Sequence, residues 1–591
     1  MATQKTTSIN RVAIIGAGPT GIACAKYLLA EKAFKTIAIF EQRQNVGGIW
    51  NLSGTDRTRR IPIPQIDPRY GTGTSSSGMN DSLEFESPLY DYLETNIPKT
   101  MMAYSDMPFA KDLPLYPKHD DVLRYLEAYA EPVRHLIHFH TQVVQVKPLD
   151  RPAHASRLAQ QWSVTTKDLQ TGTLQEAKYD AVIVANGHYT VPHVPAIPGI
   201  AEWHTKYPNA IMHSKAYRRP EDFAGQKVLV IGNSASGLDI AGQLAPCAQQ
   251  PVYLASRSAS QLAPTGGGPN WRKDVSEIEE FLVDDGNRTV RTKNNELISN
   301  LDAVIFATGY FYSFPFLSTS STPSTSNSSS KTQSPSPTDS STSLDFAPAQ
   351  NDVTTTPSSS TTKAPPTTTP LPPLTTTGLR THQIYHHFLH TTHPTLSLPL
   401  LNLKVVPFPL AENQAAVIAR LWSGRLDLPS QSEMCKWERD EEERLLAAHR
   451  LRPASGTDTA SGDTVSAHDP DESANPGTKV KYEGGFHTLT YPEDAAQLNT
   501  LHAWASSARM DPRLENNGVG KLGTRWDEES VWLRGQFPNI KAAYARLREG
   551  RFRVRCVEEL EGWRGAFQRW KRETSEEEQA DLFRRAGVVG W

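Results

Sequence analysis

The sequence predicts an α/β fold built on two dinucleotide-binding units. Near the N-terminus an apolar run, a glycine-rich turn, a stretch of helical spacing and a second apolar run follow one another. The same order recurs around residue 232. A strand, a helix and a second strand in this order are typical of a βαβ unit, so the chain is expected to contain two of them.

The first unit covers residues 12–41. Residues 12–15 form a short β-branched run, residues 22–29 have helical spacing, and residues 36–40 form a second apolar run. The turn between the first run and the helix reads GAGPTG. This order predicts a site that binds a pyrophosphate at the N-terminus of the helix. The alternative is a glycine turn that holds no ligand.

Each glycine of this turn has its own task. Gly16 lets the chain turn sharply, Gly18 lets the backbone approach a pyrophosphate, and Gly21 lets the helix pack closely on the sheet. Glu41 follows 20 residues after Gly21, where a carboxylate accepts hydrogen bonds from ribose hydroxyls. Because a carboxylate repels a 2′-phosphate, the first site is predicted to hold FAD or NAD and not NADP.

A flexible glycine pair follows the acid. Residues 47–50 read GGIW, so Gly48, Ile49 and Trp50 come just after Glu41. We interpret these three residues as further cofactor contacts. The alternative is an ordinary turn with a core tryptophan.

The second unit begins at residue 228. Residues 228–231 lead into GNSASG, a helix is predicted to about Ala245, and residues 252–255 form the next strand. Ser234 stands at the middle glycine position of the pattern, so the approach of backbone to phosphate is more crowded here than in the first unit.

Arg257 has the place in the second unit that Glu41 has in the first, 20 residues after Gly237. A guanidinium there can pair bidentately with a ribose 2′-phosphate, which predicts NADP(H). The alternative is an exposed arginine at a strand end. Two sites of opposite ribose preference in one chain imply an electron path from NADPH to a flavin.

Composition excludes several classes of protein. The 61 Lys and Arg against 64 Asp and Glu give a formal charge of −3, which argues against a nucleic-acid binder. Four scattered cysteines without CxxC spacing are neither a disulfide framework nor a zinc site. No signal peptide, lipidation signal or run of 18 apolar residues is present, so a cytoplasmic protein without a membrane span is expected.

Two polar tracts are set apart from the fold. Of the 60 residues from 318 to 377, 43 are Ser, Thr or Pro, which predicts a long disordered insertion. Residues 453–479 are rich in Gly, Ser, Thr and Asp and predict a flexible loop. Removing these 60 and 27 residues leaves 504, enough for two or three domains.

The stretch before the second glycine turn carries a longer motif. Tyr207, Asn209, His213 and Tyr217 fall on the FxGxxxHxxxY/F element of the flavin-containing monooxygenases, with Tyr207 for Phe and Asn209 for Gly. The sequence therefore resembles that family of flavoenzymes with two dinucleotide sites. The resemblance implies two Rossmann-like domains, an FAD domain with an NADP domain inserted into it.

Other segments extend the resemblance over nearly all of the chain outside the polar tracts. Residues 301–317 are similar to the ATGY segment of the family, a buried strand ending in a turn that joins the two domains. Residues 184–189 are similar to the crossover into the NADP domain. Residues 95–109 resemble the segment that reaches the flavin with an asparagine, here Asn96. The likeness resumes after the first polar tract and runs through residues 405–429.

The resemblance also implies a reaction. NADPH would reduce FAD, reduced flavin would capture O2, and the resulting C4a-hydroperoxyflavin would pass one oxygen atom to a soft nucleophile, sulfur or nitrogen, of a small molecule. The resemblance thus implies an FAD- and NADPH-dependent monooxygenase of the N,N-dimethylaniline monooxygenase type. The likeness is greatest to a fungal-type soluble branch that includes thiol-specific enzymes, so small thiols or sulfides are favoured.

Asn96 is the predicted catalytic residue. A neutral amide can both donate and accept a hydrogen bond at the oxygenated flavin without protonating it. The alternative is a turn cap before Pro98. The full set of predicted cofactor contacts is Gly16, Gly18, Pro19, Gly21, Glu41, Gly48, Ile49, Trp50, Thr95, Asn96, Gly232, Ser234, Ser236, Gly237, Arg257, Thr308 and Gly309.

The predicted domains follow from these motifs. They are an FAD-binding domain at 1–202, an NADP-binding domain at 203–300, a return into the FAD domain at 301–317, the insertion at 318–377, the second part of the FAD domain at 378–452, a loop at 453–479 and a mostly helical region at 480–591.

The sequence leaves other functions open. Baeyer-Villiger and N-hydroxylating flavin monooxygenases share both glycine motifs, although the former have Trp followed by Pro or Asp where this chain has Tyr217 and Arg218. A two-nucleotide disulfide reductase would need a CxxC that is absent from the sequence. A catalytically inactive scaffold or surface protein with a mucin-like stalk is the remote alternative.

Three features have weaker functional interpretations. His213 is a general base or, more simply, a structural residue of the linker. Histidines cluster at residues 382–393, but the run has no HExxH and no acidic residue, so a strand pair is predicted there instead of a metal site. The arginine-rich stretch at 530–572 predicts a solvated helix face balanced by nearby glutamates, without a ligand.

Overall fold

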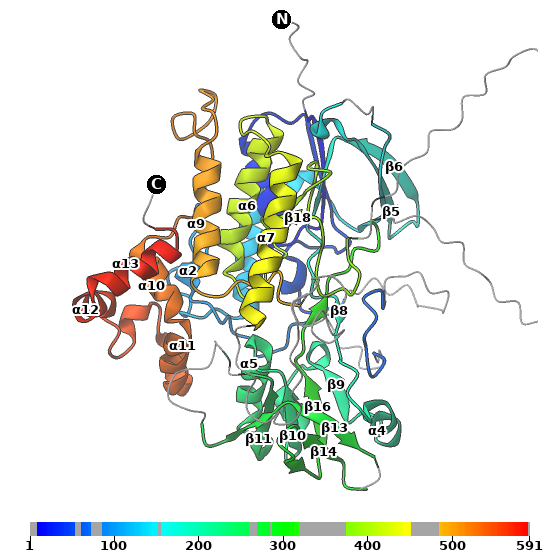
Figure 1. Cartoon of the computed structure of the whole chain (residues 1–591), viewed down its shortest axis with the longest axis vertical. Helices are drawn as coiled ribbons and strands as arrows, with labels where there is room; N and C mark the ends of the chain where they lie inside the picture. The colour runs from blue at the N-terminus through cyan, green and yellow to red at the C-terminus, as the bar shows by residue number, and fades with distance from the viewer. Residues whose placement is uncertain are drawn as a thin grey trace, which may run out of the picture.

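The structure is a computed structural model of the chain (Figure 1). It describes residues 9–53, 61–71, 86–151, 155–258, 260, 269–283, 286–317, 371, 374–450 and 484–588. The predicted insertion at 318–377 lies almost entirely outside these residues, and the predicted loop at 453–479 lies wholly outside them.

The larger sheet has seven strands in the order β18-β19-β20-β7-β1-β2-β3. At its centre β1 (Arg11–Ile15) runs parallel to β2 (Thr36–Phe40) and to β7 (Ala181–Val184). The remaining strands are β3 (Ile137–His138), β18 (Ile384–Tyr385), β19 (Leu389–His390) and β20 (Leu396–Ser397). The chain beyond the first polar tract thus returns to complete the N-terminal sheet.

The second sheet has five parallel strands in the order β12-β11-β10-β16-β9. At its centre β10 (Lys227–Ile231) lies between β11 (Gln249–Ser256) and β16 (Ala303–Phe306). Its outer strands are β9 (Ile211–His213) and β12 (Arg272–Ser276). All five strands come from a stretch between β7 and β20 of the first sheet, so the fold is α/β with two Rossmann-like units, as predicted.

Small antiparallel sheets accompany the two large ones. They are β4 (Thr141–Pro148) with β5 (Trp162–Asp168) and β6 (Leu174–Tyr179), β13 (Ile278–Leu282) with β14 (Thr289–Thr292) and β15 (Leu297–Ile298), and β8 (Val191–Pro192) with β17 (Tyr310–Phe311). The β8–β17 pair joins the segments on which the chain enters and leaves the second unit.

Helices cover the sheets and form a separate C-terminal group, at the left of Figure 1. The α-helices are α1 (Pro19–Ala30), α2 (Lys99–Met102), α3 (His119–Ala130), α4 (Ile200–Lys206), α5 (Ala235–Leu244), α6 (Pro407–Trp422), α7 (Gln431–Arg450), α9 (Glu493–Ser506), α10 (Glu528–Gly535), α11 (Phe537–Arg546), α12 (Ala566–Glu573) and α13 (Glu576–Arg585). The short 3-10 helices are η1 (Gly48–Trp50), η2 (Glu131–Leu136), η3 (Arg157–Ala159), η4 (Ser214–Ala216), η5 (Pro220–Phe223), η6 (Arg548–Arg553) and η7 (Val557–Glu559).

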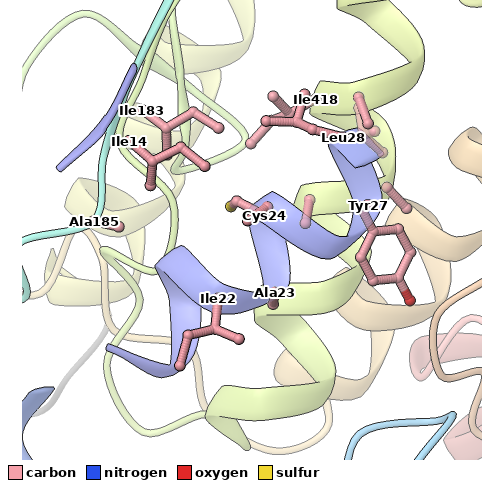
Figure 2. Close-up of a cluster of buried hydrophobic side chains, with 14 of the residues drawn as sticks. Ile14, Ile22, Ala23, Cys24, Tyr27, Leu28, Ile183, Ala185 and Ile418 are labelled. Carbon is pink, nitrogen blue, oxygen red and sulfur yellow. The ribbon is translucent and has the colours of Figure 1, made fainter. Parts of the chain in front are cut away.

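The core of the larger unit forms around α1. Its side chains are apolar on most sides because the helix is enclosed between the sheet and α6. Figure 2 shows Ile14 and Ile183 of adjacent strands close to Cys24, with Ile418 of α6 next to Leu28, and all five side chains are buried. This packing fixes α1, and with it the glycine turn at its start.

A buried carboxylate joins α6 to the C-terminal part of the chain. Glu412 is fully buried and accepts hydrogen bonds from the hydroxyl of Thr524 at 2.5 Å and its amide at 2.8 Å. The hydroxyls of Ser105, at 2.8 Å, and Tyr27, at 3.1 Å, also donate to it. Three distant segments therefore depend on one acceptor, whose burial raises its pKa and whose hydrogen bonds oppose that rise.

We predict that Glu412→Gln destabilises the protein by about 2 kcal/mol, because the new amide group would face donors instead of accepting from them. Thermal unfolding of the FAD-loaded protein measures this as a lower midpoint. In the control, Glu296→Gln breaks an exposed ion pair with Lys273 and should change the midpoint little. Equal midpoints for the two variants would contradict the prediction.

Candidate cofactor sites

The first glycine turn has no room for a side chain at Gly16 or at Gly21. Gly16 has φ +100°, and a Cβ there would lie 2.6 Å from the carbonyl oxygen of Ala185 on the crossover. At Gly21 a Cβ would lie 1.9 Å from the carbonyl oxygen of Gly16. Pro19 occupies the first turn of α1, where a missing N–H costs nothing. The start of α1 is therefore held close to the carboxyl ends of β1 and β7, as a pyrophosphate site requires.

Glu41 lies directly beside this turn. It is buried, and its two carboxylate oxygens accept hydrogen bonds from the backbone amides of Ala17 and Arg43, each at 2.8 Å. Burial raises the pKa of Glu41, and these hydrogen bonds act in the opposite direction. Each oxygen keeps a lone pair for a ribose hydroxyl, so the residue fits the adenosine ribose of FAD.

The GGIW turn packs against the first glycine turn. The amide of Gly47 donates to the carbonyl of Ala17 at 2.9 Å, and a Cβ on Gly18 would lie 3.6 Å from the Cα of Gly48. Ile49 accepts a hydrogen bond from the hydroxyl of Ser87 at 2.5 Å, and Trp50 is half-buried against the core. The structure thus brings the predicted FAD contacts from Gly16 to Trp50 together.

The second turn repeats the geometry of the first. Gly232 has φ +111°, and a Cβ there would lie 2.4 Å from the carbonyl oxygen of Ala307. At Gly237 a Cβ would lie 1.8 Å from the carbonyl oxygen of Gly232. Ser234 and Ser236, at the start of α5, are exposed. A serine therefore fits the middle position, since its side chain points into open space beside the helix N-terminus.

Arg257 follows β11 directly and is exposed. The pKa of His193 is lowered to about 4, mainly by burial of its ring and additionally by the positive charge of Arg257. The carbonyl of His193 accepts a hydrogen bond from the hydroxyl of Thr308 at 2.5 Å, and its amide donates to the carbonyl of Gly309 at 3.0 Å. Thr308 and Gly309 thus meet His193 just after β16, and Arg257 is near enough to His193 for its charge to act on that ring.

His213 makes hydrogen bonds through both ring nitrogens. Its Nδ1 accepts from the amide of Lys215 at 3.1 Å, so its Nε2 carries the proton and donates to the carbonyl of Gly309 at 3.0 Å. The ring is buried, and burial lowers its pKa to about 3. These bonds support the structural interpretation of His213, which joins the linker to the ATGY turn.

The departures from the family element have a structural reason. Asn209 adopts φ +76°, the left-handed conformation for which glycine is the usual residue and which asparagine tolerates better than most. Tyr207 stacks edge-on against the buried ring of Trp203, so the aromatic position keeps its packing role.

Asn96 lies in a turn and is exposed. The preceding Thr95 is buried: its amide donates to the carbonyl of Pro117 at 2.9 Å, and its hydroxyl donates to the carbonyl of Ile97 at 3.0 Å. The backbone amide and the side chain of Thr95 are therefore held in place, while the side chain of Asn96 is exposed, where a ligand can reach it.

The histidine run forms strands, as predicted. β18 and β19 pair antiparallel at the edge of the seven-stranded sheet. His387 lies 3.1 Å from His487, Nδ1 to Nδ1, and His390 packs against His393. Within the described ranges no three His, Cys, Asp or Glu side chains gather as metal ligands would.

Sequence reasoning missed two connections. Arg218, which is buried, donates to the carbonyls of Leu89 at 3.0 Å and Ser87 at 3.2 Å, and so links the second unit to the segment that contacts Ile49. Arg551 was assigned to a solvated helix face, but its Nη2 lies 2.7 Å from a carboxylate oxygen of Glu94. Each partner is far away along the chain, so no local pattern indicated it.

The fold and both turns define a class, a flavoprotein oxidoreductase with two dinucleotide sites. Residues 79–265 match the family described as flavin-binding monooxygenase-like, and residues 14–63 match an NAD(P)-binding Rossmann-like domain. The thiol-specific monooxygenase of Saccharomyces cerevisiae is 31% identical over 425 residues, which cover 71% of this chain and 78% of that protein.

Two further comparisons agree. Flavin-containing monooxygenase FMO GS-OX5 of Arabidopsis thaliana is 35% identical over 332 residues, covering 54% of this chain and 64% of that protein. The solved S-allyl-L-cysteine S-oxygenase of Allium sativum has the same fold, with a TM-score of 0.58 at 23% identity over 98% of this chain and 99% of that one. The chain belongs to the flavin-containing monooxygenase family, and its cofactors are FAD and NADP(H).

Among the helices that the structure describes, none has the length and apolar character needed to cross a bilayer.

We predict that Gly237→Ala raises the KM for NADPH by at least about tenfold, because the new methyl group would force α5 away from the Gly232 turn. FAD content should be unchanged, since α1 is not affected. The matched control is Gly242→Ala in the same helix, where a Cβ would meet no atom within 4 Å. That variant should bind NADPH normally and be slightly more stable. Similar KM values for both variants would contradict the prediction.

Proposed function

We propose that this chain is an NADPH-dependent flavin monooxygenase that transfers one oxygen atom of O2 to a sulfur or nitrogen atom of a small molecule. The observation that supports it most is the opposite character of the two ribose positions. Glu41 follows β2 beside one glycine turn, and Arg257 follows β11 of the unit that holds the other. A carboxylate suits the unphosphorylated ribose of FAD, and a guanidinium suits the 2′-phosphate of NADPH.

The residues of the chain bind and orient, whereas the flavin, when bound, supplies hydride acceptance and oxygen transfer. Gly16, Gly18 and Gly21 bring backbone amides to the FAD pyrophosphate, and Gly232, Ser234 and Gly237 do so for NADPH. Neither role needs a strong base. This agrees with a His213 ring that stays neutral and fully hydrogen-bonded.

Asn96 is proposed to contact the flavin where O2 reacts. Its amide is uncharged and can donate one hydrogen bond while accepting another. The hydrogen bonds of Thr95 hold the residue before Asn96 in place, which limits the directions in which that amide can point. The alternative role is a turn cap before Pro98, which precedes α2.

Thiols and sulfides are the favoured substrates. The yeast relative is described as thiol-specific and the Allium neighbour as an S-oxygenase, and this chain is proposed to act on the same kind of soft sulfur atom. Amine oxidation of the N,N-dimethylaniline type remains the second candidate. Baeyer-Villiger oxidation is disfavoured because Arg218, not Pro or Asp, follows Tyr217. The buried guanidinium of Arg218 donates hydrogen bonds to backbone carbonyls.

We predict that Arg257→Gln lowers kcat/KM for NADPH by about 10- to 100-fold and leaves that for NADH nearly unchanged, because one charge-assisted phosphate contact is lost. Initial-rate kinetics with both nucleotides measure this preference. In the control, Arg291→Gln removes an arginine of the same unit that pairs with Glu279 at 3.2 Å, and it should keep the preference. A preference for NADPH that survives Arg257→Gln would argue against the assignment.

The proposed activity predicts yellow protein that consumes NADPH faster than NADH and takes up oxygen in proportion. Cysteamine, glutathione and a tertiary amine are to be compared as substrates, with the oxygenated product identified by mass. Stimulation by a thiol would support sulfur oxidation, and stimulation by the amine alone would favour the second candidate. Colourless protein that cannot be reconstituted with FAD would refute the proposal in favour of an inactive scaffold.

A further inference from the structure

The segment from residue 90 to residue 96 lies along α5 of the second unit. Tyr90 donates its hydroxyl hydrogen to Asp239 of α5, and Gln243 of the same helix donates to the carbonyl of Tyr92 at 3.2 Å. Gln243 also donates to Asp239 at 3.1 Å. The helix that begins at the second glycine turn therefore holds the chain that leads to Asn96.

Lys541 of α11 holds the same segment from the C-terminal region. Its Nζ donates to the carbonyl oxygen of Thr95 at 2.7 Å and lies 3.9 Å from a carboxylate oxygen of Glu94. Burial lowers the pKa of Lys541, and the charges of Asp239 and Glu94 oppose that change. The ammonium group of Lys541 thus connects α11 to the segment at residues 90–96, and it lies near enough to Asp239 of α5 for the two charges to interact.

Arg551 of η6 strengthens this attachment. Its Nη2 and Nε lie 2.7 Å and 3.2 Å from one carboxylate oxygen of Glu94, whose side chain is only 12% exposed. Such charge-assisted contacts are stronger and more directional than neutral ones. Two cations of the C-terminal region therefore fix the two residues before Asn96.

The bond to the Thr95 carbonyl has a geometric consequence. The carbonyl carbon and oxygen of Thr95, together with the nitrogen and Cα of Asn96, lie in one peptide plane. A donor that fixes the carbonyl direction therefore fixes the plane from which the Asn96 side chain leaves. Lys541 acts on that plane without contacting Asn96 itself.

Resting on the function proposed above, we infer that Lys541 is a positioning residue for Asn96. Helix α11 holds the Thr95–Asn96 peptide so that the Asn96 amide stays directed at the flavin, and oxygen passes to substrate instead of leaving as hydrogen peroxide. The C-terminal region is thereby part of the oxygenating machinery.

The two fates of oxygen can be measured separately. In productive turnover NADPH, one proton, O2 and the substrate give NADP+, oxygenated substrate and water. In the unproductive reaction NADPH, one proton and O2 give NADP+ and hydrogen peroxide. The rate of peroxide release with NADPH and O2 alone therefore reports how well bound oxygen is retained, without any choice of substrate.

The test uses the full-length, FAD-loaded protein. Lys541→Met is expected to raise substrate-free peroxide release about tenfold, with unchanged FAD content and KM for NADPH, since one charge-assisted hydrogen bond is lost. Lys541→Arg keeps a hydrogen-bond donor, so its peroxide release should stay close to that of the wild type. The matched control is Lys571→Met, a lysine of α12 that pairs with Glu528 at 2.8 Å within the C-terminal region, and it should behave as wild type.

A double-mutant cycle decides whether Lys541 acts through Asn96. If it does, Asn96→Ala alone raises peroxide release, and adding Lys541→Met to it causes little further change. The inference would be overturned if Lys541→Met released peroxide at the wild-type rate. It would also be overturned if the effects of the two substitutions on peroxide release were fully additive in the double variant. If Lys541→Met is insoluble, Arg551→Gln takes its place in the cycle with the same expectations. A wild-type protein that oxygenates no thiol, sulfide or amine would instead defeat the proposed function.

Discussion

The closeness of each nucleotide-facing helix to the turn before it is the constraint on which the structure depends. A Cβ at Gly21 would lie 1.9 Å from the carbonyl oxygen of Gly16, and one at Gly237 would lie 1.8 Å from that of Gly232. Only glycine allows α1 and α5 to start so near their strands. Under the proposed function, the positive end of each helix would face a pyrophosphate at a fixed place, and Glu41 and Arg257 would each have a defined ribose to contact.

Local sequence patterns predicted these units well because the forces that shape them are local. The strand expected at 12–15 is Arg11–Ile15, and the helix expected to end near Ala245 ends at Leu244. The first helix starts earlier than its apolar spacing suggested, at Pro19, since proline suits the first turn of a helix. Local conformation also explains Asn209, which replaces the glycine of the family motif because its backbone adopts a positive φ.

Contacts between distant segments could not be predicted in this way. Periodicity predicts helix through residues 530–572, where the structure has α10, α11 and α12 with 3-10 helices and turns between α11 and α12. It cannot show that Arg551 pairs with Glu94, which is 457 residues away. The buried Glu412 is equally unmarked in sequence, since its donors Tyr27, Ser105 and Thr524 belong to three separate segments. Both cases concern the region after α6. The contacts of this region with the two residues before Asn96 can therefore be seen only in the three-dimensional structure.

The place of the first polar tract explains how the fold accommodates it. Leu317, just before it, and Leu371 and Leu374, at its end, are buried in the same apolar cluster. The amide of Tyr312 donates to the carbonyl of Gly378 at 2.7 Å, so the two flanks also meet by hydrogen bonding. Because both ends are held together, extra chain length between them costs only about 0.6 kcal/mol for each doubling. The return strands β18–β20 can therefore complete the seven-stranded sheet whatever the length of the tract.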